Sequence, residues 1–317
     1  MNRPKYAFFK GKIVPIDEAH VSVMTHALNY GTAAFGGIRA YWNADDSQLY
    51  IFRPRDHFTR LRSSAKLLMI DLPYSAEDLT NILVDLLRQE NQHENMYIRP
   101  LIYISQEGIG VKLHDLPSEF TMFAFPYGSY LAKDDSLNVG FSSWRRVDDN
   151  MIPARGKISG AYVNSALIKT EAIKSGYDEA LVLNEDGHIS EASAANFVMI
   201  RNGKAITPPN NANVLEGITL RTVMTLLSEV MGVEVVERNI DRTEVYNAEE
   251  AFFCGTGVQI ASIGTIDHRT IGTGQIGPIV SELRRLFFEA VQGKLPDYQH
   301  WVQPVFTSES ISTHKTK

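Results

Sequence analysis

Apolar residues recur along much of this chain at the spacing that places them on one face of a helix. Between residues 55 and 68, Phe58, Leu61 and Ala65 follow this pattern. Asp56 stands in the first turn, where a carboxylate could cap the free amides. The same spacing predicts helices over residues 76–91, 163–175, 219–231 and 278–291.

A second pattern, short apolar runs bounded by turn-forming residues, predicts strands. The chain opens with a hairpin of Tyr6–Lys10 and Lys12–Ile16 that turns at Gly11. Further strands are predicted over residues 96–105, 120–125, 139–144, 179–183, 196–200, 233–236 and 251–254, with a hairpin turn at Asn202-Gly203. Strands and helices mix without a regular β–α–β alternation, which favours an α+β fold over a doubly wound sheet.

A turn-rich stretch after residue 125 divides the chain into two predicted domains. We expect a smaller N-terminal domain over residues 1–125, an interdomain linker over 126–135 and a larger domain over 136–303. The polar residues 304–317 are predicted to be disordered. A chain of 317 residues is long enough to bury two substantial cores.

Composition excludes some classes of function. The net charge of −6 argues against a nucleic-acid partner, whose phosphates attract basic surfaces. No apolar run approaches the roughly 20 residues that span a bilayer, and charges come too early for a signal peptide. The single cysteine, Cys254, cannot form an internal disulfide, which favours a reducing cytoplasm. Its apolar neighbours predict a core residue.

Candidate chemistry begins at Lys157, which stands in the segment Arg155–Tyr162 among Gly, Ser and Ala. Small neighbours would leave room for a bulky group, and a lysine amine in a partly dry pocket becomes a nucleophile toward carbonyls. The aldehyde cofactor pyridoxal phosphate would suit it. An exposed loop lysine remains the alternative. A cofactor site would also require an acid for the ring nitrogen, backbone amides for the phosphate and a cation elsewhere in the sequence.

Two segments could meet the first two needs. Glu191 stands alone between a predicted strand and a run of small residues, where a carboxylate could hold a proton on a pyridine nitrogen. Gly217 precedes a predicted helix with Thr219 in its first turn, and a helix start attracts anions. A solvated acid and an ordinary capped helix are the alternatives for these segments.

Further glycines and one arginine complete the set. Gly255-Thr256-Gly257 ends an apolar strand and lets backbone amides approach a ligand, although a plain turn would read the same. Arg60 lies beside the apolar face of the first helix and could turn toward a phosphate or toward solvent. The run Gly272–Gly277 matches G-x-G-x-x-G, but only a terminal helix follows, so we interpret it as a loop that leads into a helix at Pro278. No zinc or serine hydrolase motif occurs, and no metal site is predicted.

Together these segments resemble the class IV aminotransferases, which are fold-type IV pyridoxal 5′-phosphate enzymes, and in particular the branched-chain amino acid aminotransferases. The resemblance runs from Tyr6 to about Trp301. It is carried by the motifs His26–Thr32, Gly37–Tyr41, Tyr97–Leu101, Gly156-Lys157, Ile189–Glu191, Pro208-Pro209, Gly217–Thr219 and Gly255-Thr256. It implies a two-domain α+β fold similar to D-amino acid aminotransferase, with the cofactor between the domains.

The resemblance also implies a reaction and a role for each matching residue. The enzyme would transfer an amino group from Leu, Ile or Val to 2-oxoglutarate, giving a branched 2-oxo acid and L-glutamate. Lys157 would form the internal Schiff base and carry the α-proton, Glu191 would hold the ring nitrogen, and Tyr162 the ring hydroxyl oxygen. Further cofactor contacts would come from Leu215 on the ring face, from Arg60, Ile218, Thr219 and Thr256 at the phosphate, and from Gly217 and Gly255.

The implied substrate pocket combines aromatic rings with one cation. An aromatic wall accepts a branched aliphatic side chain, and Arg99 with nearby tyrosine hydroxyls could bind the distal carboxylate of glutamate. In this family the loop that matches residues 108–111 enters the neighbouring subunit's site, so a homodimer or an oligomer of dimers is implied. The pocket residues would be Tyr30, Phe35, Gly36, Gly37, Arg39, Tyr97, Arg99, Val111, Tyr127, Tyr130, Thr256 and Gly257.

One position departs from the family pattern. Branched-chain enzymes usually read Phe-Glu-Gly-Ile-Arg where this chain has Gly36 after Phe35. Losing a carboxylate predicts a roomier, less polar pocket that extends to (R)-primary amines. The alternative functions are an (R)-amine or D-amino acid transaminase of the same fold, a catalytically silent binding protein, and a nicotinamide-dependent enzyme through Gly272–Gly277.

Overall fold

The computed structural model describes residues 3–128 and 136–307. These residues form two compact units. The first unit consists of residues 3–128, 156–160 and 288–307, and the second of residues 136–155 and 161–287. The short segment that carries Lys157 therefore belongs to the first unit, although the sequence on both sides of it belongs to the second.

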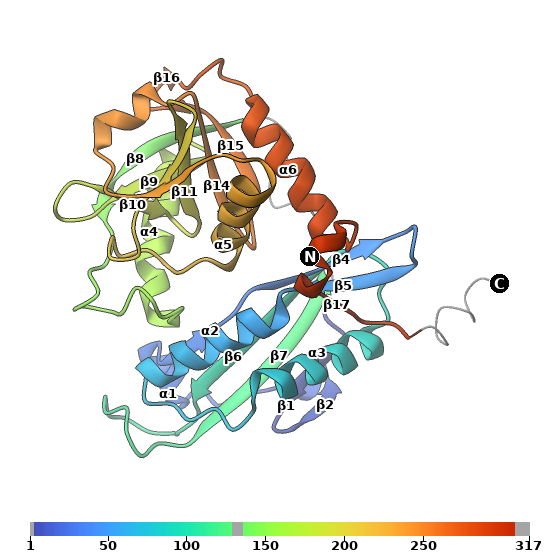
Figure 1. Cartoon of the computed structure of the whole chain (residues 1–317). Helices are drawn as coiled ribbons and strands as arrows, with labels where there is room; N and C mark the ends of the chain where they lie inside the picture. The colour runs from blue at the N-terminus through green and yellow to red at the C-terminus, as the bar shows by residue number, and fades with distance from the viewer. Residues whose placement is uncertain (1–2, 129–135, 308–317) are drawn as a thin grey trace. The chain divides into compact units, whose positions relative to one another are not determined.

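The first unit is built on an antiparallel sheet with the strand order β17-β5-β4-β6-β7-β1-β2, and β3 pairs with β6 (Figure 1). A tight turn joins β1 to β2, which is the predicted hairpin at Gly11. Its strands are β1 (Tyr6–Phe9), β2 (Lys12–Pro15), β3 (Ala33–Phe35), β4 (Ile38–Asn43), β5 (Gln48–Phe52), β6 (Met96–Ile104), β7 (Ser118–Pro126) and β17 (Val302–Pro304).

Two amphipathic helices, α2 (Pro54–Leu67) and α3 (Ala76–Glu90), lie across one face of this sheet (Figure 1). Along β6, buried Met96 and Ile98 alternate with the partly exposed Tyr97 and Arg99. Because successive side chains of a strand point to opposite faces, the sheet has one covered face and one that presents Tyr97 and Arg99.

The helix starts show where side chains satisfy free backbone amides. Ser75 caps α3 in a capping box, in which Asp78 accepts a hydrogen bond from the Ser75 amide at 2.8 Å. The predicted cap of α2 by Asp56 is wrong. Arg53 occupies the position before α2, and the Asp56 carboxylate accepts a hydrogen bond from its Nε at 2.7 Å instead.

The second unit contains a mixed sheet with the strand order β10-β9-β8-β15-β14-β11-β12-β13, and β16 pairs with β15. Helix α4 (Tyr162–Lys174) connects β8 to the parallel strand β9, which makes one β–α–β crossover. The strands are β8 (Leu137–Arg145), β9 (Glu179–Leu183), β10 (Ile189–Ala192), β11 (Asn196–Arg201), β12 (Lys204–Thr207), β13 (Val235–Glu237), β14 (Glu250–Gly255), β15 (Gln259–Ile266) and β16 (Arg269–Thr270).

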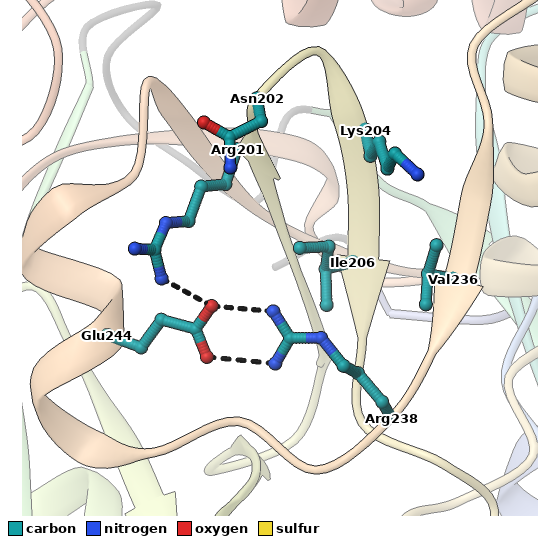
Figure 2. Close-up of a pocket in the computed structure, with 7 residues that line it drawn as sticks. All are labelled: Arg201, Asn202, Lys204, Ile206, Val236, Arg238 and Glu244. Carbon is teal, nitrogen blue, oxygen red and sulfur yellow. Dashed lines mark hydrogen bonds and ion pairs between the residues drawn. The ribbon is translucent and has the colours of Figure 1, made fainter.

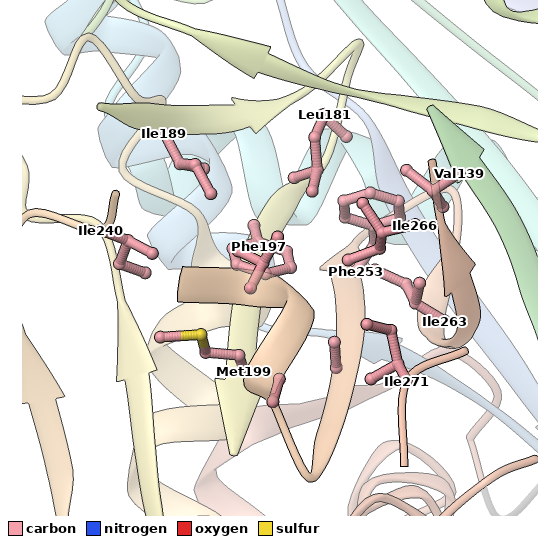
Figure 3. Packing of buried hydrophobic residues seen from close by; sticks show 14 of the residues in the cluster. Val139, Leu181, Ile189, Phe197, Met199, Ile240, Phe253, Ile263, Ile266 and Ile271 are labelled. Atoms are coloured by element: carbon pink, nitrogen blue, oxygen red, sulfur yellow. The ribbon is translucent and has the colours of Figure 1, made fainter. Parts of the chain in front are cut away.

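Alternate side chains of these strands point into one apolar core (Figure 3). Phe197 of β11 and Phe253 of β14 meet there edge to face, with ring centres 6.1 Å apart. Leu181, Ile189 and Met199 surround them and are fully buried. Burying each such side chain contributes roughly 1.5–3 kcal/mol, so the core holds the strand ends that carry Glu191 and Gly255 in place.

The remaining helices are short or lie near the ends of the chain. The predicted helix over 219–231 divides into α5 (Ile218–Thr225) and a π-helical turn, and the last predicted helix is confirmed as α6 (Pro278–Val291). The other turns of helix are α1 (His26–Tyr30), η1 (Ile16–Glu18), η2 (Ser159–Ala161), η3 (Leu226–Val230), η4 (Arg242–Asn247) and η5 (Pro296–Trp301). Within residues 3–128 and 136–307, none of the helices combines the length and apolar character that crossing a membrane requires.

Candidate active site

The backbone of Lys157 is bonded on both sides within the first unit. Its amide donates a hydrogen bond to the Ser64 hydroxyl of α2 at 3.1 Å, and its carbonyl accepts one from the Phe35 amide at 3.0 Å. The Lys157 amine lies 5.0 Å from the centre of the Phe35 ring. A lysine amine against an aromatic face, on a backbone that cannot shift easily, is well placed to meet a carbonyl ligand.

Glycines in the Lys157 segment, and Gly31 opposite it, lie where a side chain would meet neighbouring atoms. A methyl group on Gly156 would meet Leu67 at 3.0 Å, and one on Gly31 would lie 2.8 Å from the Gly160 Cα. The Gly160 amide also donates to the Gly31 carbonyl at 3.1 Å. Gly31 and Gly156 therefore allow close packing of this segment against its neighbours.

An aromatic wall, formed by Phe35, Tyr97, Phe125 and Tyr127, occupies the open face of the first unit's sheet. The Tyr97 ring lies 5.7 Å from Phe125 and 5.5 Å from Tyr127, measured between ring centres. The Arg99 guanidinium carbon lies 4.7 Å from the centre of the Phe35 ring. Lys157 and Arg99 thus both contact Phe35, and an apolar surface carries two cations.

Arg99 has donors suited to an acidic ligand. One of its terminal nitrogens donates to the Tyr97 hydroxyl at 2.9 Å. Its Nε is buried and has no hydrogen-bond partner among the residues that the structure describes. A buried donor without a partner is costly, and a carboxylate is the ligand that would satisfy it best.

The second predicted pocket arginine, Arg39, is nearly fully buried and serves the wall itself. It donates to the Gly128 carbonyl at 3.1 Å, and its guanidinium carbon lies 5.1 Å from the Tyr127 ring centre. Gly37 has a role of the same kind. A methyl group there would lie 2.4 Å from the Tyr97 hydroxyl, so glycine lets that hydroxyl approach the backbone.

Gly36 is explained by local packing. A methyl group at this position would lie 2.7 Å from Cγ of Pro100, and the Gly36 amide donates to the Pro100 carbonyl at 2.8 Å. The proline ring belongs to β6 and cannot rotate away. A glycine that accommodates its neighbour supplies no evidence for a wider pocket.

The structure describes three further predicted site residues of this unit, Tyr30, Val111 and Arg60. The Tyr30 hydroxyl accepts a hydrogen bond from the Gly110 amide at 3.2 Å, and Val111 is 77% exposed. Arg60 lies on α2, where its carbonyl accepts from the Ser64 hydroxyl at 3.0 Å. Tyr130 lies outside the described residues.

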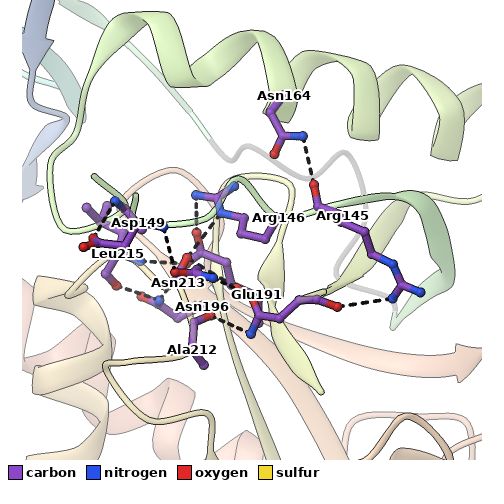
Figure 4. Close-up of polar contacts among 12 residues, drawn as sticks. Arg145, Arg146, Asp149, Asn164, Glu191, Asn196, Ala212, Asn213 and Leu215 are labelled. Atoms are coloured by element: carbon purple, nitrogen blue, oxygen red, sulfur yellow. Dashed lines mark hydrogen bonds and ion pairs between the residues drawn. The ribbon is translucent and has the colours of Figure 1, made fainter. Parts of the chain in front are cut away.

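In the second unit, Glu191 is the centre of a buried polar cluster, the Glu191 network, formed with Arg146, Asn196 and Leu215 (Figure 4). One carboxylate oxygen lies 2.6 Å from a terminal nitrogen of Arg146. The other accepts hydrogen bonds from the Asn196 side-chain amide at 3.0 Å and from the Leu215 backbone amide at 3.2 Å. Sequence reasoning predicted Glu191 but gave no role to Arg146 or Asn196.

Gly217 connects this network to the start of α5. A methyl group at Gly217 would lie 2.0 Å from the side-chain oxygen of Asn196, so the glycine makes room for Asn196. Asn196 also donates to the Leu215 carbonyl at 2.9 Å. The first intrahelical bond runs from Arg221 to Gly217. The amides of Ile218 and Thr219 therefore precede the hydrogen-bonded part of α5, at its positive end.

The remaining predicted elements of this unit lie at strand and helix ends. Gly255 closes β14, Thr256 and Gly257 follow it in a turn, and Tyr162 begins α4. Cys254 is fully buried, and both its burial and the charge of Glu191 raise the pKa of its thiol. The prediction that Cys254 is a core residue is confirmed.

A surface pocket elsewhere in the second unit contains none of the predicted site residues. It is lined by Arg201, Asn202, Lys204, Ile206, Val236, Arg238 and Glu244 (Figure 2). Glu244 accepts hydrogen bonds from Arg201 at 2.6 Å and from Arg238 at 2.6 and 2.8 Å. These ion pairs tie η4 to β11 and to the residue after β13, which is a structural role.

Comparison with known proteins places the chain among relatives of similar length. A family model described as amino-transferase class IV matches residues 33–266. A probable branched-chain-amino-acid aminotransferase of Aquifex aeolicus is 48% identical over 301 residues, which cover 95% of this chain and 97% of the relative. The crystal structure of a branched-chain aminotransferase from Thermoproteus uzoniensis with norvaline has a TM-score of 0.91 at 39% identity, covering 96% of this chain and 100% of that one. The branched-chain amino acid aminotransferase of Thermobaculum terrenum, in its PLP-bound holo form, has a TM-score of 0.92 at 38% identity, with 96% and 99% covered.

Proposed function

The chain belongs to the class IV aminotransferase family, and from that premise we propose that it transfers an amino group between branched-chain L-amino acids and 2-oxoglutarate. This chain matches the relatives named above, which carry the name branched-chain aminotransferase, over almost their whole length. The cofactor is pyridoxal 5′-phosphate, which fits the PLP-bound holo form of the Thermobaculum terrenum relative.

The observation that carries this proposal is the Arg99 side chain on the aromatic wall. The wall suits a branched aliphatic side chain through apolar contact. The buried Arg99 Nε, without a partner among the described residues, suits a carboxylate, as glutamate and 2-oxoglutarate present at their distal end. One surface can therefore accept an apolar donor in one half-reaction and an acidic acceptor in the other.

The residues present also fit the cofactor. Bound pyridoxal phosphate would supply an aldehyde that accepts the amine and a pyridine ring that takes up electron density. The charged carboxylate of Glu191 suits a protonated ring nitrogen, and Tyr162 would hold the ring hydroxyl oxygen. The start of α5, where Gly217 has no side chain to cap the first amides, suits a phosphate.

Lys157 performs the proton transfer. Its amine would hold bound pyridoxal phosphate through the cofactor aldehyde, and the same amine would serve as the base and the acid of the reaction. It would take up the proton of the substrate α-carbon and hold it for return. The contacts of its backbone with Ser64 and Phe35 hold the amine in reach through both steps.

The test is an amino-donor panel with 2-oxoglutarate as acceptor and glutamate formation as readout. We expect L-leucine, L-isoleucine and L-valine to react fastest. A faster rate with D-alanine or (R)-1-phenylethylamine would establish the alternative transaminase instead. The packing of Gly36 against Pro100 accounts for that glycine without reference to substrate breadth.

We also propose that the protein acts as a homodimer. The first unit exposes a group of apolar side chains on two segments that the Thr25–Glu107 bridge and the bond from the Gly108 amide to the Met24 carbonyl hold together. Exposed apolar groups of this kind mark interaction sites, and Val111 would reach a substrate from a partner subunit. The residues are Val23 (80% exposed), Met24 (53%), Leu28 (64%), Ile109 (89%) and Val111 (77%).

Light scattering after size exclusion tests the dimer. The wild type should elute as a dimer or a multiple of it, and Val23→Asp should shift the protein toward the monomer because a buried, unpaired carboxylate is costly. Lys12→Asp, an exposed position on β2, is the control and should leave the assembly unchanged. A monomeric wild type would exclude the proposal.

A further inference from the structure

Glu191 is a carboxylate removed from water, with only 3% of its side chain exposed. A buried carboxylate stays charged only if a cation and hydrogen-bond donors replace the lost hydration. The Asn196 and Leu215 donors are neutral. Arg146, whose own side chain is 14% exposed, supplies a cation within ion-pair distance.

Arg146 is itself held in place by two other segments. Its backbone amide donates to the Leu183 carbonyl of β9 at 3.0 Å, and its Nε donates to the Asn213 carbonyl at 3.4 Å. Asn213 in turn donates hydrogen bonds to Asp148 at 3.4 Å and to Asn184 at 3.1 Å. The guanidinium thus lies between β9 and the loop that leads to Leu215, and its direction toward Glu191 is set by both.

We propose that Arg146 is a positioning residue for the transamination reaction, which keeps the Glu191 carboxylate charged and directs it toward the cofactor ring nitrogen. The inference rests on the proposed function, because it assumes that Glu191 faces a pyridine ring. Arg146 acts through Glu191 and has no assigned contact with substrate.

The consequence for the reaction follows from charge. A protonated ring nitrogen takes up electron density well, and a carboxylate beside it favours that protonated form. Without Arg146, the buried Glu191 carboxylate would take up a proton more readily, and a neutral carboxylic acid supports the ring proton poorly. The chemical step would then slow, whereas substrate binding on the aromatic wall would change little.

The first measurement uses Arg146→Gln and Arg146→Lys holoenzymes in single-turnover half-reactions with L-leucine between pH 6 and pH 9. We expect Arg146→Gln to lower the maximal rate about tenfold or more, equivalent to one pKa unit of lost stabilisation. The apparent dissociation constant for leucine should change less than about threefold. Arg146→Lys should restore much of the rate because it restores the charge. Arg238→Gln, which removes an arginine from the Glu244 pairs, is the matched control and should keep the wild-type rate.

The second measurement does not depend on turnover. Melting temperatures of Arg146→Gln, Glu191→Gln and the double variant, with and without cofactor, form a double-mutant cycle. If Arg146 compensates the Glu191 charge, the double variant should melt at a higher temperature than Arg146→Gln alone, because the unpaired charge is gone. Losses that simply add would overturn the proposal.

The outcomes separate this inference from the proposed function. A wild type that transfers no amino group in the donor panel removes the proposed function, whatever the cycle shows. An active wild type whose Arg146→Gln variant keeps its rate and pH profile overturns the positioning role alone. If Arg146→Gln does not fold, folding of the double variant supports the pairing, and failure of both to fold overturns it.

Discussion

The aromatic wall and the Glu191 network use charged side chains in opposite ways. On the wall, Arg99 keeps a buried Nε without a partner among the described residues, and Lys157 rests its amine against a ring. In the network, both oxygens of Glu191 are bound by groups of its own unit. The wall thus has a hydrogen-bond donor that a ligand can satisfy, whereas the Glu191 carboxylate is already bound by groups of its own unit.

This difference separates the expected consequences of substitution. Loss of the Lys157 amine or of the Arg99 guanidinium on the wall should impair turnover more than it lowers the free energy of unfolding. Loss of a residue of the Glu191 network should lower both turnover and the free energy of unfolding, because its buried partner is left without compensation. The following variants test that separation.

Lys157→Ala should show the largest effect on turnover and almost none on stability. It removes the proposed attachment point and proton carrier, and we expect a loss on the order of 10³-fold or more, in the range of general acid–base catalysis. Steady-state glutamate formation and a thermal melt measure the two quantities. Turnover within tenfold of the wild type would contradict the assignment.

Glu191→Gln should impair both quantities. A neutral amide cannot favour the protonated ring, so half-reaction rates with L-leucine should fall on the order of 100-fold. The variant also leaves Arg146 without its carboxylate, which costs about 3 kcal/mol or more. Urea unfolding measures that cost. A variant as stable as the wild type would show that the Glu191 network does not contribute to the free energy of unfolding.

Arg99→Met should discriminate between the two substrates. Loss of a charge-assisted hydrogen bond should lower kcat/KM for 2-oxoglutarate by about 10- to 100-fold, whereas the half-reaction with L-leucine should change little. Stability should stay the same or rise, since a buried donor without a partner is removed. An equal loss with both substrates would place the distal carboxylate elsewhere.

Gly217→Ala should affect the network without changing any charge. The new methyl group must displace Asn196, and such overpacking costs about 1–3 kcal/mol. We expect weaker cofactor binding as well, because Asn196 contacts both Glu191 and the segment before α5. Gly128→Ala, where a methyl group meets open space, is the control and should melt as the wild type does.

Glu244→Gln should have the smallest effect of these variants. Glu244 is, like Glu191, a carboxylate paired with arginine, but it lies outside the candidate site. Hydrogen bonds from Arg238, and then from Arg201, hold the pKa of its carboxyl below the ordinary value of 4.5. A depressed pKa stabilises the fold at neutral pH, and this contribution is lost as the pH falls below about 4.5. The melting temperatures of wild type and Glu244→Gln should therefore converge on acidification. A gap that is constant from pH 7 to pH 3 would contradict this origin.

Local sequence signals predicted those elements whose residues interact mainly with near neighbours. Helix α3 was predicted within one residue and α6 at its observed bounds, because apolar spacing and nearby caps determine both. The hairpin turn at Asn202-Gly203 is confirmed, with positive φ at both residues. Strands β3, β4 and β5 were not predicted, because their short runs become strands by pairing with distant parts of the chain: β3 and β4 pair with β6, and β5 pairs with β4 and β17.

The sequence by itself determined the family, and the resemblance to class IV aminotransferases is confirmed by the family model. Motif residues such as Lys157 and Glu191 are recognised because their type and order along the chain carry the information. Tertiary structure alone decided the partners of those residues. Arg146 precedes Glu191 by 45 positions, and the fit of Gly217 to Asn196 and of Gly36 to Pro100 depends on distances of a few ångströms across strands and loops. Pairing of a buried charge and close packing against a glycine both depend on which residues are near in space. No local pattern in the sequence shows which distant residues will be near.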